Sequence, residues 1–361
     1  MHLMHDAGQF ISEFPGCVPM PDTLAFSPAL LDSHCIIDVR TPLEFIEDHL
    51  PGASNVPILN DAERVEIGTI HKQQGPQTAR IRALELTCSR FADMVHEIAS
   101  IAAGRPVLVY CWRGGLRSRS MAILLESCGY PVTQLIGGYK AFRNQVLSFF
   151  ESFSLPVPLI VVHGMTGSGK TTFINGLDRS RCSTIDLEGL ASHRGSAFGS
   201  VGLAKQPHQK RFDTLLWDAF RHTPADRPIV LEGESQRIGN ITLPGRIYEV
   251  MSSSCKVWCS VSLDTRVNRL AEEYAHTEYR EPMVAALERI RKKLGGARYA
   301  ELRALLDNWD VPAAARGLME HYYDKLYYKN RTWEADFEID LEDFGVGEEQ
   351  FWNNWELRSS A

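Results

Sequence analysis

The chain lacks the features of membrane-embedded and secreted proteins. None of its apolar runs approaches the roughly 20 residues that a helix needs to cross a bilayer. The first residues, MHLMHDAGQFISEF, have neither the basic n-region nor the apolar h-region of a signal peptide. The eight cysteines follow no disulfide framework, and Cys255 and Cys259 form only a weak metal-binding pattern. We therefore expect a cytoplasmic protein with reduced thiols and no membrane partner.

Internal repeats, low-complexity tracts and an excess of positive charge are also missing. The net charge of -7 argues against indiscriminate nucleic-acid binding but is compatible with a local basic face. The runs KQPHQKR (205–211) and RIRKKLGGAR (289–298) are candidates for such a face, and each is equally well explained as a solvated helix surface. With 361 residues, 44% of them hydrophobic, the chain is long enough for two domains.

Strands and helices alternate along the chain, which predicts an α/β fold with parallel sheets. In the first half, apolar strands at 34–40 and 105–111 flank an amphipathic helix at 90–100. A second α/β unit starts with the strand at 159–164, and the chain becomes helical and polar from about Asp264. The predicted limits are 1–150 for the first domain (core about 25–150), 151–158 for a proline-containing linker, 159–330 for a second domain with a helical extension, and 331–361 for a tail without an assignment.

The stretch YCWRGGLRSRS (110–120) sets a cysteine at the end of a strand, ahead of a loop rich in glycine and arginine. The helix that follows aims its N-terminal amides at the sulfur, and the arginines add full positive charge. Such surroundings favour the nucleophilic thiolate and can hold an oxyanion beside it. Packing alone explains the buried cysteines that we expect at 35, 128, 182 and 259. The candidate nucleophile is Cys111, and the candidate oxyanion loop comprises Trp112, Arg113, Gly114, Gly115, Leu116, Arg117 and Ser118.

A phosphate-binding loop follows. GMTGSGKT (164–171) fits Gly-x4-Gly-Lys-Ser/Thr, follows an apolar strand and opens a helix. Its amides would wrap one phosphate, Lys170 would reach a neighbouring one, and Thr171 would bind Mg²⁺ where that ion is present. The pattern indicates a diphosphate and says nothing about adenine. The predicted diphosphate-binding residues are Gly164, Met165, Thr166, Gly167, Ser168, Gly169, Lys170, Thr171 and Thr172.

A Walker-B aspartate and a nucleobase signature are both missing, so an ordinary ATPase is not the expected function. The segments TIDLEGL and IVLEGES each place carboxylates after an apolar run. These carboxylates either support the phosphate loop or lie in solvent at the ends of strands. Arg266 and Arg269 lie three residues apart at the start of a predicted helix, where they either close over the diphosphate or form salt bridges. The carboxylates in question are Asp186, Glu188, Glu232 and Glu234.

The segments IDVRTPLEF, DHLPGASNVP and LIGGYKAFR resemble the rhodanese signature over about residues 25–150. That resemblance implies a domain that carries sulfur or a related chalcogen on its loop cysteine. The spacing from Cys111 to Arg117 is one residue longer than in the usual sulfurtransferase loop and also occurs in protein phosphatases. A wider loop implies a larger oxyanion, and selenophosphate meets that requirement.

A rhodanese-like domain followed by a phosphate-loop domain, with YCWRGGLRS, DLEGLASHRGSAFG (186–199) and EGESQRIG (232–239), resembles the tRNA 2-selenouridine synthase family. The resemblance implies a transferase that acts on tRNA with 2-thiouridine at the wobble position. It further implies geranyl diphosphate and selenophosphate as co-substrates, with S-geranylation preceding the entry of selenium. The phosphate loop would then hold geranyl diphosphate, and Cys111 would serve the selenium step. Trp112 would stack on a base or line the prenyl pocket.

Three other interpretations remain open at this point. A fusion of a rhodanese-type phosphatase with a kinase would use Cys111 and Arg117 to hydrolyse phosphate, although no general-acid region is evident. A regulatory module would bind ATP tightly and no prenyl diphosphate. A tRNA sulfurtransferase would need an adenylation motif, which the sequence does not show.

Overall fold

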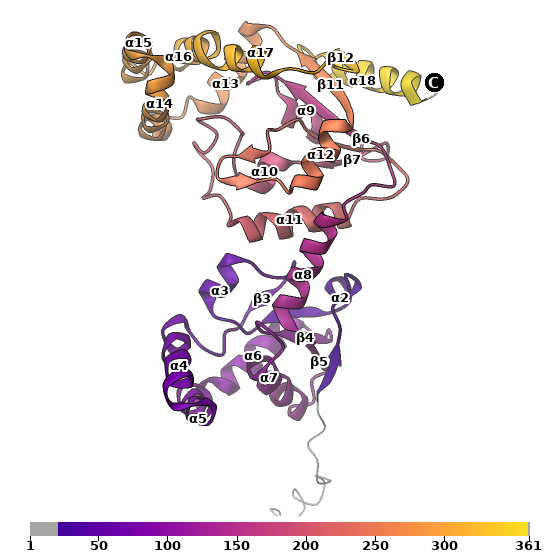
Figure 1. The fold of residues 1–361 in the computed structure, drawn as a ribbon, viewed down its shortest axis with the longest axis vertical. Coiled ribbons are helices and arrows are strands. Elements are labelled where there is room, and N and C mark those ends of the chain that lie inside the picture. The colour runs from indigo at the N-terminus through magenta and orange to yellow at the C-terminus, as the bar shows by residue number, and fades with distance from the viewer. Residues whose placement is uncertain (1–20, 360–361) are drawn as a thin grey trace, which may run out of the picture. The chain divides into compact units, whose positions relative to one another are not determined.

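The structure is a computed structural model that describes residues 21–359. The chain forms two compact units, Met1–Val146 and Leu147–Ala361, and each has its own parallel five-stranded sheet in the part that is described (Figure 1). The predicted α/β class is therefore confirmed. Helix α8 (Gly138–Glu151) contains the division between the units. After it, the chain has no regular structure up to residue 158, and Phe153 is buried against Phe220, with 4.8 Å between the ring centroids.

The sheet of the first unit has the strand order β1-β5-β4-β2-β3, and all neighbours are parallel. Strand β4 is fully buried at its centre, because helices cover the apolar run VLVY. The candidate nucleophile follows directly after this strand. The strands are β1 (Asp22–Leu24), β2 (Cys35–Asp38), β3 (Ser54–Asn55), β4 (Val107–Tyr110) and β5 (Val132–Leu135).

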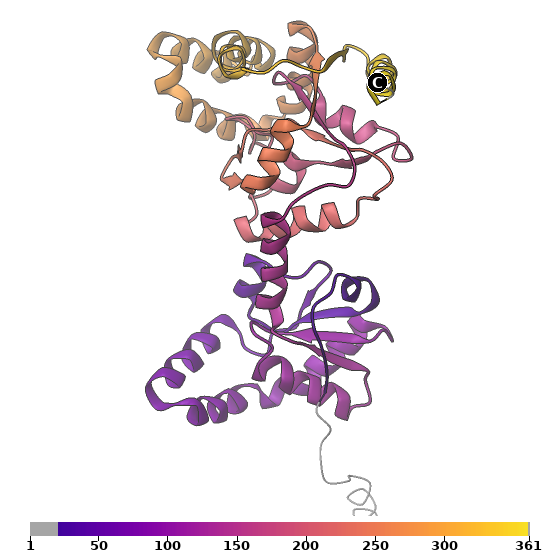
Figure 2. The ribbon, with the colours of Figure 1, turned by 45° about the vertical axis from the view of Figure 1, so that its right-hand side comes forward.

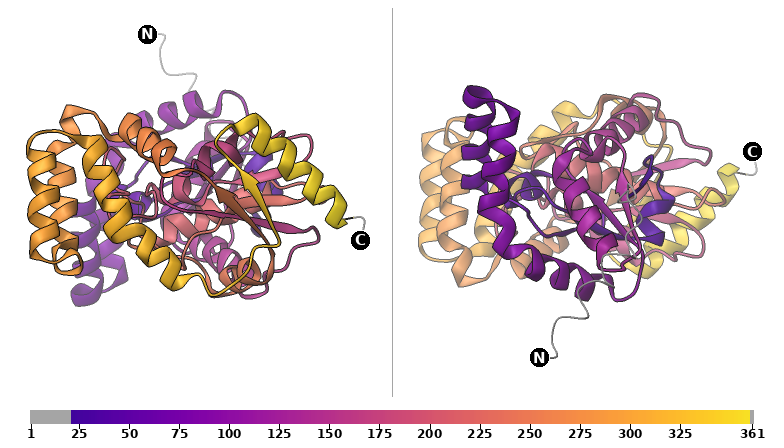
Figure 3. Two further views of the ribbon diagram at one scale, coloured as in Figure 1. Left: turned by 90° about the horizontal axis from the view of Figure 1, so that it is seen from above. Right: turned by 90° about the horizontal axis from the view of Figure 1, so that it is seen from below.

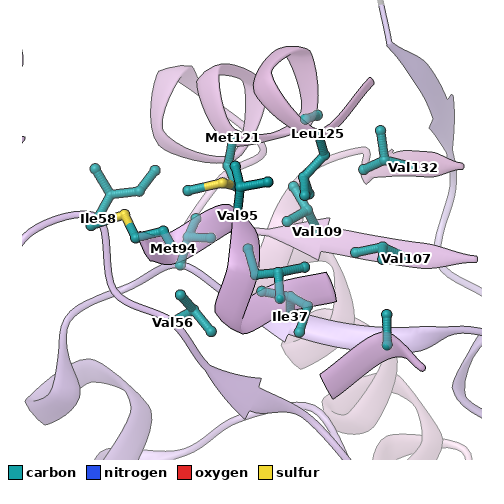
Figure 4. Packing of buried hydrophobic residues seen from close by; sticks show 14 of the residues in the cluster. Ile37, Val56, Ile58, Met94, Val95, Val107, Val109, Met121, Leu125 and Val132 are labelled. Atoms are coloured by element: carbon teal, nitrogen blue, oxygen red, sulfur yellow. The ribbon is translucent and has the colours of Figure 1, made fainter. Parts of the chain in front are cut away.

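The core of the first unit packs helices α6 and α7 against this sheet (Figure 4). The predicted stripe on α6 is largely confirmed, since Met94, Val95 and Ile98 are buried. On α7, Met121 and Leu125 are buried, but Cys128 is exposed, contrary to expectation, because the helix ends at Ser127. The helices are α2 (Ala29–Ser33), α3 (Pro42–Glu47), α4 (Asp61–Gln74), α5 (Pro76–Thr87), α6 (Phe91–Ala102), α7 (Leu116–Ser127) and α8.

Helices α4 and α5 are a feature that the sequence pattern did not predict. They pack side by side, joined at Gly75 (Figure 2). Helix α4 has no fully buried residue, so it lacks the apolar stripe that reveals a helix in a sequence.

The sheet of the second unit has the order β12-β11-β6-β8-β7, again with parallel neighbours. A short antiparallel pair, β9 and β10, lies outside it. Strand β6 is central, and the phosphate loop follows it. The strands are β6 (Leu159–Gly164), β7 (Ser183–Ile185), β8 (Ile229–Glu232), β9 (Arg237–Ile238), β10 (Ile241–Thr242), β11 (Cys255–Ser260) and β12 (Phe337–Asp340).

Residues 331–359, which the sequence left without an assignment, belong to the second unit. Strand β12 extends the sheet, and α18 packs on it through the buried Phe351 and Trp352 (Figure 3). The helices are α9 (Lys170–Gly176), α10 (Leu187–Ala191), α11 (Gln209–Arg221), α12 (Gly245–Ser253), α13 (Leu263–Tyr274), α14 (Arg280–Leu294), α15 (Gly296–Asp307), α16 (Val311–Leu318), α17 (Asp324–Asn330) and α18 (Phe344–Ser359), with a π-helical turn (Met319–Tyr323) before α17.

Two expectations about thiols and membranes can be compared with residues 21–359. The cysteines in this range are free, with Cys35, Cys182 and Cys259 buried as expected, whereas Cys17 lies outside the described residues. Within the same range, no helix is both long and apolar enough to span a bilayer.

Candidate functional site

The first candidate site is the loop between β4 and α7, which begins at Cys111 (Figure 1). The loop folds tightly onto the turn before α8, where Tyr139 N–H donates to the Cys111 carbonyl at 2.8 Å. Gly138 has a φ of +57°, and a side chain there would lie 2.2 Å from the same carbonyl oxygen. The second glycine of LIGGYKAFR, Gly138, is therefore required because the backbone here lies too close to the cysteine loop for a side chain.

The sulfur of Cys111 is nearly enclosed, with the residue only 4% exposed, and accepts two hydrogen bonds. Gly115 N–H and the Ser118 hydroxyl each donate to Sγ at 3.2 Å. Gln134 on β5 donates to the Ser118 oxygen at 2.9 Å and to the Gly114 carbonyl at 2.9 Å. Neighbouring parts of the same segment thus direct two hydrogen-bond donors at the sulfur. The sequence indicated Gly115 and Ser118 but not Gln134, because a single glutamine inside a strand carries no signal of its contact with the loop.

Arg117 of the loop forms an ion pair with a residue of α3. Its guanidinium contacts Glu44, with 2.6 Å between Nη1 and Oε2. Glu44 also caps α3 reciprocally with Thr41. Burial would raise the pKa of Glu44, but the bonds and charge of Arg117 outweigh it and lower that pKa. Arg117 is therefore fixed beside the loop, whereas Arg113 and Arg119 are exposed.

Beneath the loop lies a buried polar network built on the IDVR motif. Arg40 forms an ion pair with Asp38, with 2.6 Å between Nη2 and Oδ2, and its guanidinium lies 4.1 Å from the ring centroid of Tyr139. Trp112 packs on the same ring, 5.2 Å away between centroids. The half-buried Trp112 therefore contacts the protein's own aromatic residues at the edge of the loop.

The second candidate site is the phosphate loop between β6 and α9 (Figure 1). Lys170 Nζ donates to the Gly164 carbonyl at 3.1 Å, so the ammonium lies over the loop's own backbone. Gly169 has a φ of +81°, and a side chain there would come within 2.9 Å of the Phe344 ring. Gly164 and Ser168 are buried, whereas Thr172 is exposed. The geometry is that of an anion-binding loop at a helix N-terminus.

Arg266 and Arg269, both on α13, contact backbone carbonyls of the phosphate loop. The buried Arg266 pairs with Asp324 through two contacts, of 2.9 and 2.8 Å, and also lies 3.4 Å from the Thr166 carbonyl. Arg269 donates to the Ser168 carbonyl at 2.7 Å. Of the two roles open from the sequence, the salt bridge is the one that Arg266 has in this structure.

Two of the candidate carboxylates face the phosphate loop. Glu188 Oε2 accepts from the Thr171 hydroxyl at 3.2 Å. Burial and the neighbouring Glu234 raise the pKa of Glu188 to about 7, and burial also raises the pKa of Glu234. Burial would lower the pKa of Lys170, but the surrounding phenol and carboxyl groups raise it overall. The two glutamates are thus shifted toward their protonated forms, while the lysine stays charged.

The other two carboxylates have structural roles. Glu232 is fully buried at the end of β8, and its Oε2 accepts from Leu187 N–H at 2.8 Å. Burial and the nearby Asp186 raise the pKa of Glu232 to about 9. Asp186 caps α10 by accepting from Gly189 N–H at 2.6 Å. Both support the wall of the site, and the sequence alone did not separate them from Glu188 and Glu234.

Metal binding was expected only at Thr171. In the described part of the chain, no group of three or more His, Cys, Asp or Glu side chains is arranged to hold a metal ion. Thr171 and Glu188 are adjacent oxygen donors next to the phosphate loop, the kind that Mg²⁺ takes together with phosphate oxygens. The local chemistry therefore fits a phosphate-bound Mg²⁺, and the need for that ion stays a prediction.

The phosphate loop opens into a cavity of about 540 Å³. Its wall includes Lys170 and the glutamate pair, as well as a group of aromatic side chains. The sequence did not predict these aromatic walls, because they come from distant segments. The aromatic and histidine residues of the wall are His163, Tyr248, Trp258, Tyr274, Tyr322, Tyr323, Tyr327 and Trp333.

An apolar pocket of about 40 Å³ adjoins this cavity. The two share five lining residues, so the hydrocarbon wall begins where the phosphate site ends. Helices α14 and α16 supply much of the wall, including Met283, Ala315 and Leu318. The shared residues are Thr166, Ser196, Leu270, Tyr274 and Tyr323.

Comparison with protein families gives one match for each unit. A model described as a rhodanese-like domain matches residues 27–145. A model described as the tRNA 2-selenouridine synthase AAA domain matches residues 157–338. The second match spans the phosphate loop and the segments that form the cavity.

Several curated proteins named tRNA 2-selenouridine synthase are similar to this chain over most of their length. The protein from Cupriavidus necator is 35% identical over 337 residues, which is 85% of this chain and 91% of that protein. The protein from Bordetella bronchiseptica is 35% identical over 346 residues, with 87% and 93% coverage. The protein from Shewanella loihica is 32% identical over 330 residues, with 82% and 87% coverage.

Proposed function

Because the chain belongs to the tRNA 2-selenouridine synthase family, we propose that it exchanges the sulfur of wobble 2-thiouridine in tRNA for selenium. The enzyme is a tRNA-modifying transferase with one reactive loop in each unit. Two loops of different chemistry fit a reaction in two steps. The first step activates the sulfur as a leaving group, and the second replaces it.

In the first step the thiocarbonyl sulfur attacks C1 of geranyl diphosphate. A carbon–sulfur bond forms, the carbon–oxygen bond breaks, diphosphate leaves with the electron pair, and the uracil ring loses its N3 proton. Lys170 and the loop amides stabilise the growing charge on the diphosphate. Glu188 and Glu234 line the same cavity, and burial raises the pKa of both side chains. This pair can therefore exchange a proton with the substrate.

The observation that carries this step is the apolar pocket next to the phosphate loop. A nucleoside triphosphate needs hydrogen-bonding partners for its base and sugar, whereas a prenyl diphosphate needs a hydrocarbon wall beside an anion site. The shared lining of the pocket and the cavity supplies that combination. The missing nucleobase signature in the sequence agrees with it.

In the second step, selenium from selenophosphate bonds to C2 and geranylthiol leaves. Water then takes the phosphoryl group, so phosphate is released and 2-selenouridine remains. Cys111 serves this step as the attacking thiolate: its sulfur bonds to C2 as geranylthiol leaves, and selenium from selenophosphate then displaces that sulfur from C2. Gly115 N–H and the Ser118 hydroxyl orient the sulfur, and Arg117 offers charge for the oxyanion. Because the thiol has to remain reduced, we place the reaction in the cytoplasm.

The test is a reconstitution with purified protein and a synthetic anticodon stem-loop that carries 2-thiouridine. Geranyl diphosphate is added first and selenophosphate second, without any nucleotide, and the nucleosides are identified by mass spectrometry. The expected products are S-geranyl-2-thiouridine and then 2-selenouridine. A requirement for ATP, or 2-selenouridine formed from a stem-loop that is never geranylated, would contradict the proposal.

A further inference from the structure

An aromatic and cationic cluster forms one wall of the cavity beside the phosphate loop. The Arg331 guanidinium lies 4.1 Å from the ring centroid of Trp258 and 5.1 Å from that of Trp333. The two indole rings are edge-to-face, 6.2 Å apart, and the His163 ring lies 4.2 Å from Trp333. All four residues line the cavity. Neither the phosphate loop nor the apolar pocket explains this cluster.

The cluster is built from segments far apart in the chain. Trp258 is on β11, and His163 ends β6 just before the phosphate loop. Arg331 and Trp333 lie in the irregular segment between α17 and β12, and both are only half-buried. Trp258 by contrast is 7% exposed. Trp333 is therefore an indole held at the cavity surface by an arginine and a second tryptophan, rather than a core residue.

The chemistry of this wall suits a nucleobase better than a prenyl chain. A prenyl chain packed on the guanidinium and the imidazole would remove their hydration without offering hydrogen-bond partners, which is unfavourable even with Glu338 3.7 Å from Arg331. A base offers a flat π-face to the indoles and carbonyl oxygens to the arginine, which is a pure donor. His163 Nε2 is buried without a hydrogen-bond partner among the described residues, and a bound base is one way to satisfy it.

We propose that Trp333, supported by Trp258 and Arg331, is the stacking site for the wobble 2-thiouridine, which leaves the anticodon stack to enter the cavity. This inference rests on the proposed function for the identity of the base. It places the thiocarbonyl sulfur in the same cavity as the diphosphate that Lys170 binds. The bare His163 ring is neutral at physiological pH, because burial and the nearby Lys170 lower its pKa to about 3. The other ring nitrogen is engaged by the Gly233 backbone, so the free Nε2 of the neutral ring is an acceptor, which suits the N3–H of uracil.

The test combines a protein substitution with a change in the RNA. Trp333→Leu removes the π-face and keeps an apolar side chain, and Trp333→Phe restores a ring. Stem-loops with 2-thiouridine or with an abasic wobble position are titrated by fluorescence anisotropy, without diphosphate ligand. Trp355→Leu, a half-buried tryptophan on α18 outside the cavity wall, is the matched control. Arg331→Gln tests the same surface if Trp333→Leu fails to fold.

We expect Trp333→Leu to weaken binding of the 2-thiouridine stem-loop about 5- to 100-fold, the range for loss of one base stack. Trp333→Phe should recover most of it, and the abasic stem-loop should show less than about a 2-fold effect. The affinity for geranyl diphosphate should stay unchanged. Because the RNA titration uses no diphosphate, it can succeed even if geranyl diphosphate proves to be the wrong donor.

Three outcomes would overturn the inference. An equal loss with the abasic stem-loop would mean that the cluster contacts another nucleotide or only holds the fold. Unchanged RNA binding in Trp333→Leu and Arg331→Gln would exclude a stacking role. Loss of ADP binding with unchanged RNA binding would make the cluster a purine site of the phosphate loop.

Discussion

Lys170→Ala should block geranyl transfer and leave the selenium step intact. The ammonium lies over the phosphate loop, where it would contact the diphosphate directly. A charge-assisted hydrogen bond of this kind contributes about 1.5–3 kcal/mol, which is roughly 10- to 150-fold in affinity. Since negative charge grows on the diphosphate as the carbon–oxygen bond breaks, the loss in rate should reach roughly 1000-fold.

The structure adds a second effect to this substitution. Lys170 faces Glu188 and Glu234, whose pKa values are already raised by burial. Without the cation, these carboxyls should hold their proton to higher pH, because an opposite charge no longer favours ionisation. The residual activity of the variant should therefore have its pH profile displaced upward. Lys329→Ala, an exposed lysine on α17, is the control and should change neither rate nor profile.

The assay uses two substrates in parallel. Single-turnover geranylation of a 2-thiouridine stem-loop measures the first step, and a pre-geranylated stem-loop with selenophosphate measures the second. The assignment of the loop is refuted if Lys170→Ala stops the second step as completely as the first. A site shared by both substrates would then explain the result better.

Three further outcomes follow from the same geometry. Cys111→Ser should abolish 2-selenouridine and retain geranylation, since a hydroxyl is not ionised near neutral pH; nucleoside mass spectrometry measures both, and normal 2-selenouridine would exclude an essential thiol. Ala315→Phe should fill the apolar pocket and raise the KM for geranyl diphosphate at least about 10-fold, with the Kd for inorganic diphosphate unchanged; weakened diphosphate binding in calorimetry would contradict this. Glu232→Gln should make the free energy of unfolding depend less on pH. The pKa of this acid rises from 4.5 to about 9 on folding, so the fold loses up to about 1.4 kcal/mol per pH unit as pH rises between those values, and denaturation of the variant at pH 6 and pH 9 should show a smaller difference than the native protein.

The cysteine loop and the phosphate loop were both predictable from the sequence because each is one continuous segment whose conformation depends on its own residues. A strand that ends in Cys111 or in the phosphate loop, followed by a helix, directs backbone amides to one point whatever the rest of the chain does. The parallel α/β class was likewise predictable, since buried strands alternate with helices. The α4–α5 pair was not, because a helix without a buried stripe leaves no periodic pattern.

By itself the sequence determined the class of fold and the positions of the cysteine loop and the phosphate loop, because these depend on neighbouring residues. The tertiary structure decided which distant side chains complete each site. Glu44 reaches Arg117 across 73 positions, and Gln134 orients Ser118 from another strand. Asp324 and Arg266, 58 positions apart, become a partly buried pair in the same way. Contacts between residues so far apart in the sequence depend on the order of the strands and the packing of the helices. The spacing of residues within one segment therefore does not predict them. The apolar pocket and the Trp333 wall exist only once α16 and the segment before β12 have packed beside the phosphate loop.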